Sequence, residues 1–293
     1  MLTEASRLEK GSYPYNTFAI PFAVEVVKLL ATSVVLVLEC ASRKYSVRLS
    51  TACVLDFFRF SIPAFCYFVS NNCIFYIIEQ LGATTFQIMN NLKILSTAIF
   101  MNMLLARRLT WTQWKALAIL MIGSMVTQLR EEATILTASN SDVGYVYVVV
   151  SAVASGAGSV FTEKLLKGQS TSTRKMDRQY EASIHWQNVQ LYAFGVIFGL
   201  ISLLTSTSNS RILSAFEGFN AFAYAAVLTM AVCGLLVSFI LKYLDNVAKC
   251  FCSAMSMLCV AIMDAAVRHE QIPFRVSLGM LLTVIALEQY HVS

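Results

Sequence analysis

The sequence predicts an all-α integral membrane protein, and two observations carry this prediction. Of its 293 residues, 57% are hydrophobic and only 13% are charged, whereas soluble domains average roughly 45–50% apolar and about 25% charged residues. The apolar residues also form runs as long as the roughly 20-residue helix that crosses a hydrocarbon layer about 30 Å thick. Because such runs occur along the whole chain, we expect a single transmembrane domain over residues 1–293.

Apolar stretches bounded by charged and turn-forming residues predict nine membrane spans. Their ranges are 17–40, 58–78, 84–105, 113–129, 143–163, 186–206, 221–241, 247–267 and 273–290. Two connections are long and polar, at 130–142 and 164–185, and the second is predicted to be a central cytosolic linker. This linker separates two half-repeats, 1–130 and 143–293.

The distribution of Lys and Arg predicts the orientation, because cytoplasmic connections carry an excess of both. The odd-numbered connections hold twelve such residues and the even-numbered ones four. The first group is Arg43, Lys44, Arg48, Arg107, Arg108, Lys164, Lys167, Arg174, Lys175, Arg178, Lys242 and Lys249, and the second is Arg130, Arg211, Arg268 and Arg275. The first connection and the C-terminus are therefore expected in the cytosol, and the start of the chain on the opposite side.

A chain that starts across the membrane without a signal sequence is difficult to produce, so we expect one further helix to be missing before residue 1. Ten helices divide into five plus five, and a duplicated unit with an odd number of helices inserts in opposite orientations. This arrangement is an inverted repeat, whose substrate site is expected near the midplane between the halves. The predicted architecture is thus an inverted 5+5 helical bundle that lacks its first helix.

Several functional classes receive no support from the sequence. The net charge is +5, but the 22 Lys and Arg residues fall mainly between apolar runs and form no basic stripe, so no nucleic-acid partner is expected. The eight cysteines lie mostly within or beside apolar runs and are expected to be free thiols. We see no cluster of His, Asp and Glu and no nucleophile beside a base, and therefore predict no enzyme activity, no metal and no cofactor.

Two lysines, Lys28 and Lys93, lie deep inside predicted spans, where each charge costs roughly 2.5–3.5 kcal/mol on insertion scales. Lys28 follows Glu25 by three residues, a spacing at which helical side chains meet. It either forms a structural ion pair or belongs to the wall of a substrate path. Lys93 has no acidic residue within one turn, so a water-filled cavity or an anionic ligand is expected beside it, with snorkelling to the interface as the alternative.

Amides and aromatic rings occur together in several spans. Asn71 and Phe86 lie in neighbouring spans, and Asn188 and Tyr192 share a helix face because they are four residues apart. An aromatic ring can stack on a nucleobase while an amide bonds its Watson–Crick edge. Amides in membrane spans also connect helices to one another, so the residues alone leave a membrane core and a base site both open.

Several long blocks resemble the CMP-sialic acid and UDP-galactose transporter family of Golgi nucleotide-sugar carriers, in the drug/metabolite transporter superfamily. The blocks are EVVKLL (25–30), SNNCIFY (70–76), TTFQIMNNLKILSTA (84–98), LTWTQWKALAILMIGSMVTQL (109–129), SGAGSVFTEKLLK (155–167), WQNVQLYAFGVIFG (186–199) and GLLVSFILKYLDNVAK (234–249). The resemblance runs in order from about residue 17 to 290. It implies a ten-helix drug/metabolite transporter-like bundle, with the first aligned block here at the second helix.

The resemblance also implies roles for individual residues. Lys28, Lys93 and Lys249 match family lysines that line a central cavity, and Asn71, Asn188 and Tyr192 match positions that contact the nucleotide. Phe86 stands where some members have Tyr, so a ring is retained without its hydroxyl. Phe194 stands where the animal CMP-sialic acid carrier has Ser. The resemblance therefore does not settle which sugar and base this protein prefers.

The function implied is a multi-pass Golgi antiporter that exchanges a cytosolic pyrimidine nucleotide-sugar for a lumenal nucleoside monophosphate by alternating access. Membrane lipid is the expected environment, and a homodimer stays an open alternative for the assembly. A small-metabolite exporter of the same superfamily would not need the base site. A truncated homologue that acts as a scaffold or regulator is the second alternative, because the first helix is expected to be missing.

Overall fold

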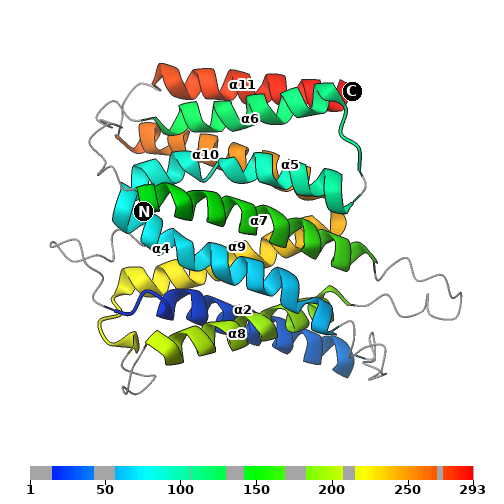
Figure 1. Cartoon of the computed structure of the whole chain (residues 1–293), viewed down its shortest axis with the longest axis vertical. Helices are drawn as coiled ribbons and strands as arrows, with labels where there is room; N and C mark the ends of the chain where they lie inside the picture. The colour runs from blue at the N-terminus through cyan, green and yellow to red at the C-terminus, as the bar shows by residue number, and fades with distance from the viewer. Residues whose placement is uncertain are drawn as a thin grey trace, which may run out of the picture. The chain divides into compact units, whose positions relative to one another are not determined.

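A computed structural model of the chain describes residues 15–42, 57–105, 107–129, 142–168, 183–206, 215–268 and 273–292, and within them it contains helices and no strand. The helices are α2 (Ala19–Ala41), α4 (Ser61–Met89), α5 (Leu92–Leu104), α6 (Trp111–Gln128), α7 (Asp142–Gly168), α8 (Ile184–Ser206), α9 (Ala221–Tyr243), α10 (Asn246–Arg268) and α11 (Phe274–Val292) (Figure 1). All nine predicted spans coincide with helical segments. Residues 130–141 and 169–182, which make up most of the two predicted polar connections, lie outside the described residues.

The described helices confirm an all-α integral membrane protein. Six of them are long and apolar enough to cross a membrane, by length and composition. They are Ala19–Ala41, Phe57–Ala83, Asp142–Gly168, Ile184–Ser206, Ala221–Tyr243 and Asn246–Met263. The chain is therefore a multi-pass membrane protein.

Helix α2 shows how the protein is adapted to lipid. Its polar residues Lys28 and Thr32 are 8% and 2% exposed, whereas Val34 and Val37 are 59% and 65% exposed. A helix of a water-soluble protein would have the opposite arrangement. The buried face packs on α8 and α9, and the exposed aliphatic face is suited to hydrocarbon.

The chain forms two compact units. The first comprises Met1–Asn72 and Phe161–Tyr243, and the second comprises Cys73–Val160 and Leu244–Ser293. Each unit takes segments from both halves of the sequence, so the units do not follow the division into 1–130 and 143–293. The inverted repeat itself stays a prediction.

In the first unit, α2 packs along α8, beside which it lies in Figure 1, and also contacts α9. Phe60, Leu191 and Phe194 belong to its main apolar cluster. In the second unit, α6 packs mainly on α11, and α10 contacts α5, α6 and α11. Each unit therefore has an apolar core that fixes the positions of the polar side chains described below.

The helical segments α4 and α5 are interrupted twice, first between the second and third predicted spans and then within the third. Gly82 has φ 78° and ψ 161°, which kinks α4, and this positive φ is readily adopted by glycine because it lacks a Cβ. The helix then stops at Asn90–Asn91 before α5 begins at Leu92. The Asn91 amide donates to the carbonyls of Gln87 and Ile88, at 3.2 and 3.1 Å, and so satisfies acceptors that a helix end leaves open.

Candidate substrate-binding site

Lys28 contacts two groups of opposite character in the first unit, a carboxylate and an aromatic ring. Its Nζ forms an ion pair with Glu25 Oε1 at 2.6 Å, as the spacing along the helix predicted. The same ammonium lies 4.4 Å from the centroid of the Tyr192 ring on α8, within the range of cation–π attraction. A buried cation is thereby held against both a carboxylate and an aromatic face.

Two glycines allow this arrangement of α2 against its neighbours. A Cβ on Gly195 of α8 would lie 2.6 Å from Glu25 Oε2, and a Cβ on Gly234 of α9 would lie 2.9 Å from Lys28 Cδ. Contacts this short force neighbouring atoms to move. The sequence contains both glycines, but only the packing of α2 on α8 and α9 shows that they make room for the ion pair.

Asn188 lies on the same helix as Tyr192, and both side chains are buried, as expected for one face of α8. The Ser238 hydroxyl on α9 donates to Asn188 Oδ1. Among the described residues, Asn188 Nδ2 has no hydrogen-bond partner. A buried amide donor without a partner costs about 1–3 kcal/mol, so a ligand acceptor at this position would remove an existing penalty.

The adjacent amides of Asn71 and Asn72 are in different environments on α4. Asn72 is buried and donates to the Phe68 carbonyl at 2.7 Å, within its own helix. Asn71 is half-buried. Of the two, Asn71 is therefore the less buried residue, and its role in binding stays a prediction.

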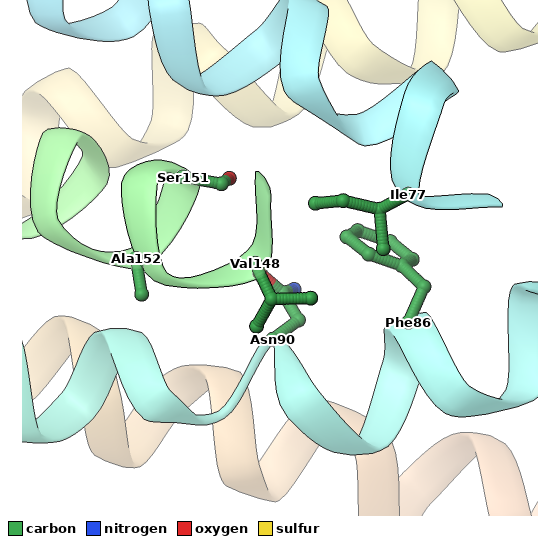
Figure 2. A pocket seen from close by; sticks show the side chains of 6 residues that line it. All are labelled: Ile77, Phe86, Asn90, Val148, Ser151 and Ala152. Atoms are coloured by element: carbon green, nitrogen blue, oxygen red, sulfur yellow. The ribbon is translucent and has the colours of Figure 1, made fainter. Parts of the chain in front are cut away.

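In the second unit, Phe86 lines a small pocket next to the helix break. The pocket is bounded by Ile77, Phe86, Asn90, Val148, Ser151 and Ala152 (Figure 2). Its cavity volume is about 10 Å³, roughly the minimum for a single water molecule and far below the roughly 300–1,000 Å³ typical of ligand pockets. The pocket is too small for a whole nucleotide-sugar, but Phe86 and two polar side chains border it.

Lys93 lies in the first turn of α5, directly after the break at Asn90–Asn91. The sequence predicted an uninterrupted span here, and this part of the prediction was wrong. Paired asparagines could have indicated the break, because their side chains compete with helical backbone hydrogen bonds. Irregular backbone at membrane depth is tolerated where it is buried in protein or lines a cavity. The break therefore places Lys93 beside irregular backbone and not within a continuous helix.

Lys249 lies in the first turn of α10 and contacts α7. Its Nζ donates to the Ser159 hydroxyl, and Ser159 in turn donates to Asn246 Oδ1. Lys249 and Lys93 both belong to the second unit. Sequence reasoning did not identify Ser159 or Asn246 as neighbours of Lys249.

The family assignment comes from comparison with known proteins. A family model described as nucleotide-sugar transporter matches residues 3–291. The chain belongs to the nucleotide-sugar transporter family.

Relatives of this transporter include proteins named for two kinds of nucleotide-sugar. CMP-sialic acid transporter 1 of Oryza sativa subsp. japonica is 29% identical, over 99% of this chain and 88% of the relative. CMP-sialic acid transporter 1 of Arabidopsis thaliana is 28% identical, over 99% and 84%. UDP-galactose translocator 1 of Caenorhabditis elegans is 30% identical, over 94% of this chain and 79% of the relative.

The candidate residues of this nucleotide-sugar transporter fall into two groups. Lys28, Asn71, Asn188 and Tyr192 belong to the first unit, and Phe86, Lys93 and Lys249 belong to the second. Within the first unit, the structure brings Lys28 and Tyr192 into contact. Within the second, Lys249 donates to the Ser159 hydroxyl. The roles of these seven residues in substrate binding stay predictions.

Proposed function

We propose that this nucleotide-sugar transporter is an antiporter of the Golgi membrane. It takes up a cytosolic pyrimidine nucleotide-sugar, of the CMP-sialic acid or UDP-galactose type, and returns the corresponding nucleoside monophosphate. Relatives named as CMP-sialic acid transporters and as a UDP-galactose translocator support this substrate class. Both ligands contain a pyrimidine nucleoside and phosphate, so the same polar groups can serve both directions of an alternating-access cycle.

The observation that carries the proposal is the cluster of Lys28, Tyr192 and Asn188 in the first unit. It combines an ammonium, an aromatic ring at 4.4 Å and a buried amide donor that lacks a partner among the described residues. These groups suit a phosphate, a stacked base and an acceptor atom on the base edge, respectively. An exporter of smaller metabolites would not need such an amide and aromatic base site.

The phosphates are the second element of the proposal. A hydrogen bond to a charged group contributes roughly 1.5–3 kcal/mol, and we propose that Lys28, Lys93 and Lys249 provide such bonds. Lys93 lies beside a helix break, and Lys249 is held by a serine hydroxyl. These surroundings differ from those of a lysine at the end of a span that extends its ammonium to the membrane surface.

The proposal is tested by exchange in proteoliposomes that contain the purified chain. Vesicles preloaded with CMP or UMP should take up labelled CMP-sialic acid or UDP-galactose faster than empty vesicles do, because release of the monophosphate resets the carrier. Preloading with GMP or AMP should not accelerate uptake. Equal uptake with and without internal monophosphate would contradict antiport.

The two alternatives give different results in the same experiment. A small-metabolite exporter would be unaffected by internal CMP and UMP. A scaffold or regulator would transport none of the substrates and would bind neither monophosphate. Binding of CMP or UMP without uptake would support the proposed binding site and contradict the proposed transport.

A further inference from the structure

The beginning of α5, which carries Lys93, is tied to α7 within the second unit. The Ser96 hydroxyl donates to the Ala152 carbonyl of α7 at 2.6 Å, in a buried hydrogen bond. The same hydroxyl lies 3.1 Å from the Lys93 carbonyl of its own helix. Because a hydroxyl has a single proton to donate, the shorter contact identifies Ala152 as the main acceptor. Ser96 therefore connects the turn that carries Lys93 to a second helix.

Gly156 allows the two helices to approach so closely. A Cβ at this position of α7 would contact Ser96 Oγ, and it would lie 2.9 Å from both the Ser96 carbonyl carbon and the Thr97 nitrogen. Two of these three atoms belong to the backbone, so rotation of a side chain cannot relieve the contact. A larger residue at 156 would therefore move the beginning of α5 away from α7.

The helix break makes this contact important for Lys93. A lysine in a continuous helix would be positioned by the whole of that helix, but α5 begins at Leu92, directly after the break. Its first turn therefore depends on its own contacts for its position. α5 also contacts α6 and α10, but the bond to Ala152 starts only three residues after Lys93. Ala152 itself borders the small pocket beside the break (Figure 2).

We propose that Gly156 and Ser96 are positioning residues that set where Lys93 lies relative to the phosphate of the ligand, a role that rests on the proposed function. A charge-assisted bond between an ammonium and a phosphate oxygen is short, about 2.7–2.9 Å. Displacement of the backbone of Lys93 therefore weakens this bond, or forces the side chain to reach the phosphate from a less favourable rotamer. Both residues act through Lys93 and not through contacts of their own with the ligand.

The test separates phosphate binding from base binding. Dissociation constants of CMP and UMP, and of cytidine and uridine, are measured for the purified full-length chain by titration calorimetry. Gly156→Ala should weaken binding of the two monophosphates about three- to thirtyfold, because the Lys93 ammonium is displaced but not removed. Binding of the two nucleosides, which lack a phosphate, should not change.

A double-mutant cycle then shows whether Gly156 acts through the lysine. In a Lys93→Ala background, Gly156→Ala should cause no further loss of CMP binding, because the group that it positions is absent. Ser96→Ala removes the bond to α7 without adding an atom, and it should weaken both monophosphates about two- to tenfold. It provides the second variant if Gly156→Ala does not fold.

Gly123→Ala is the matched control, because it overpacks another helix contact of the same unit. A Cβ at Gly123 of α6 would lie 2.9 Å from Leu282 Cβ of α11. This variant should lower the melting temperature, as overpacking does, and should leave all four affinities unchanged. A selective loss of monophosphate binding in Gly123→Ala as well would show that general destabilisation causes the effect, and would overturn the positioning role.

The remaining outcomes distinguish this role from the proposed function. The positioning role is overturned if Gly156→Ala weakens nucleosides and monophosphates equally, or if its effect adds fully to that of Lys93→Ala. It is also overturned if Gly156→Ala binds CMP and UMP normally while Lys93→Ala does not. Failure of the wild-type chain to bind either monophosphate would instead overturn the proposed function, and the positioning role with it.

Discussion

The ammonium of Lys28 lies 4.4 Å from the centre of the Tyr192 ring. One residue is on α2 and the other on α8, and both are buried. The contact joins a cation to an aromatic face that we propose for base stacking. It connects the charge-binding and base-binding parts of the site within a single unit of the protein.

The first prediction concerns the carboxylate that holds Lys28. Removal of one partner from a buried ion pair typically costs about 3–5 kcal/mol, so Glu25→Gln should lower the melting temperature of the purified protein. Addition of CMP or UMP should then stabilise the variant more than it stabilises the wild type, because the nucleotide phosphate replaces the missing anion. Melting curves with and without nucleotide measure both effects.

Glu288→Gln is the control for this substitution, because Glu288 is exposed on α11. It should change neither the melting temperature nor the response to nucleotide. If Glu25→Gln loses stability but gains no extra protection from nucleotide, Lys28 belongs to a structural pair only.

The second prediction concerns the lysines of the second unit. Lys93→Ala and Lys249→Ala should each weaken binding of CMP and UMP roughly ten- to a hundredfold, from about 1.5–3 kcal/mol per bond to a charged group at about 1.4 kcal/mol per decade. Folding of Lys93→Ala should be retained, because removal of a charge from a span relieves an insertion penalty. Titration calorimetry gives the affinities, and size-exclusion chromatography reports folding.

Lys115→Ala serves as the comparison, because Lys115 is exposed on α6 and lies 5.7 Å from the Trp111 ring centroid. Its removal should leave nucleotide binding unchanged. If a well-folded Lys93→Ala protein binds CMP and UMP normally, Lys93 does not bind the ligand and instead extends its ammonium to the membrane interface.

The third prediction concerns the base. CMP and UMP should raise the melting temperature, whereas GMP and AMP should do so far less, because a site built to bond one base edge leaves buried polar groups unpaired when another is bound. Asn188→Ala should reduce this difference by weakening pyrimidine binding. Equal protection by GMP and CMP would reject the pyrimidine assignment and leave the family membership intact.

The fourth prediction concerns the glycine that faces Glu25. Gly195→Ala places a methyl group 2.6 Å from Glu25 Oε2 and should destabilise the protein by about 1–3 kcal/mol, as overpacking typically does. Thermal melting of the purified protein measures this loss of stability. Gly168→Ala is the control for a change from glycine to alanine. A Cβ at this position meets no atom within 4 Å, so this variant should be tolerated.

Local properties of the sequence determined much of this protein. The lengths of the apolar runs located all nine helical segments, because the thickness of a membrane sets the length of a span. The three-residue spacing of Glu25 and Lys28 predicted their ion pair, since helix geometry alone brings them together. The four-residue spacing of Asn188 and Tyr192 likewise predicted a shared face.

Only the tertiary structure decided which faces of different helices meet. The Tyr192 ring beside Lys28 and the Ser159 hydroxyl beside Lys249 join residues that are distant in the sequence, and no local pattern specifies such pairs. Their contacts depend on close approaches such as that of Gly195 to Glu25. The break at Asn90–Asn91 also escaped the sequence reasoning, because an apolar run reports the length of a span but not the continuity of its backbone hydrogen bonds.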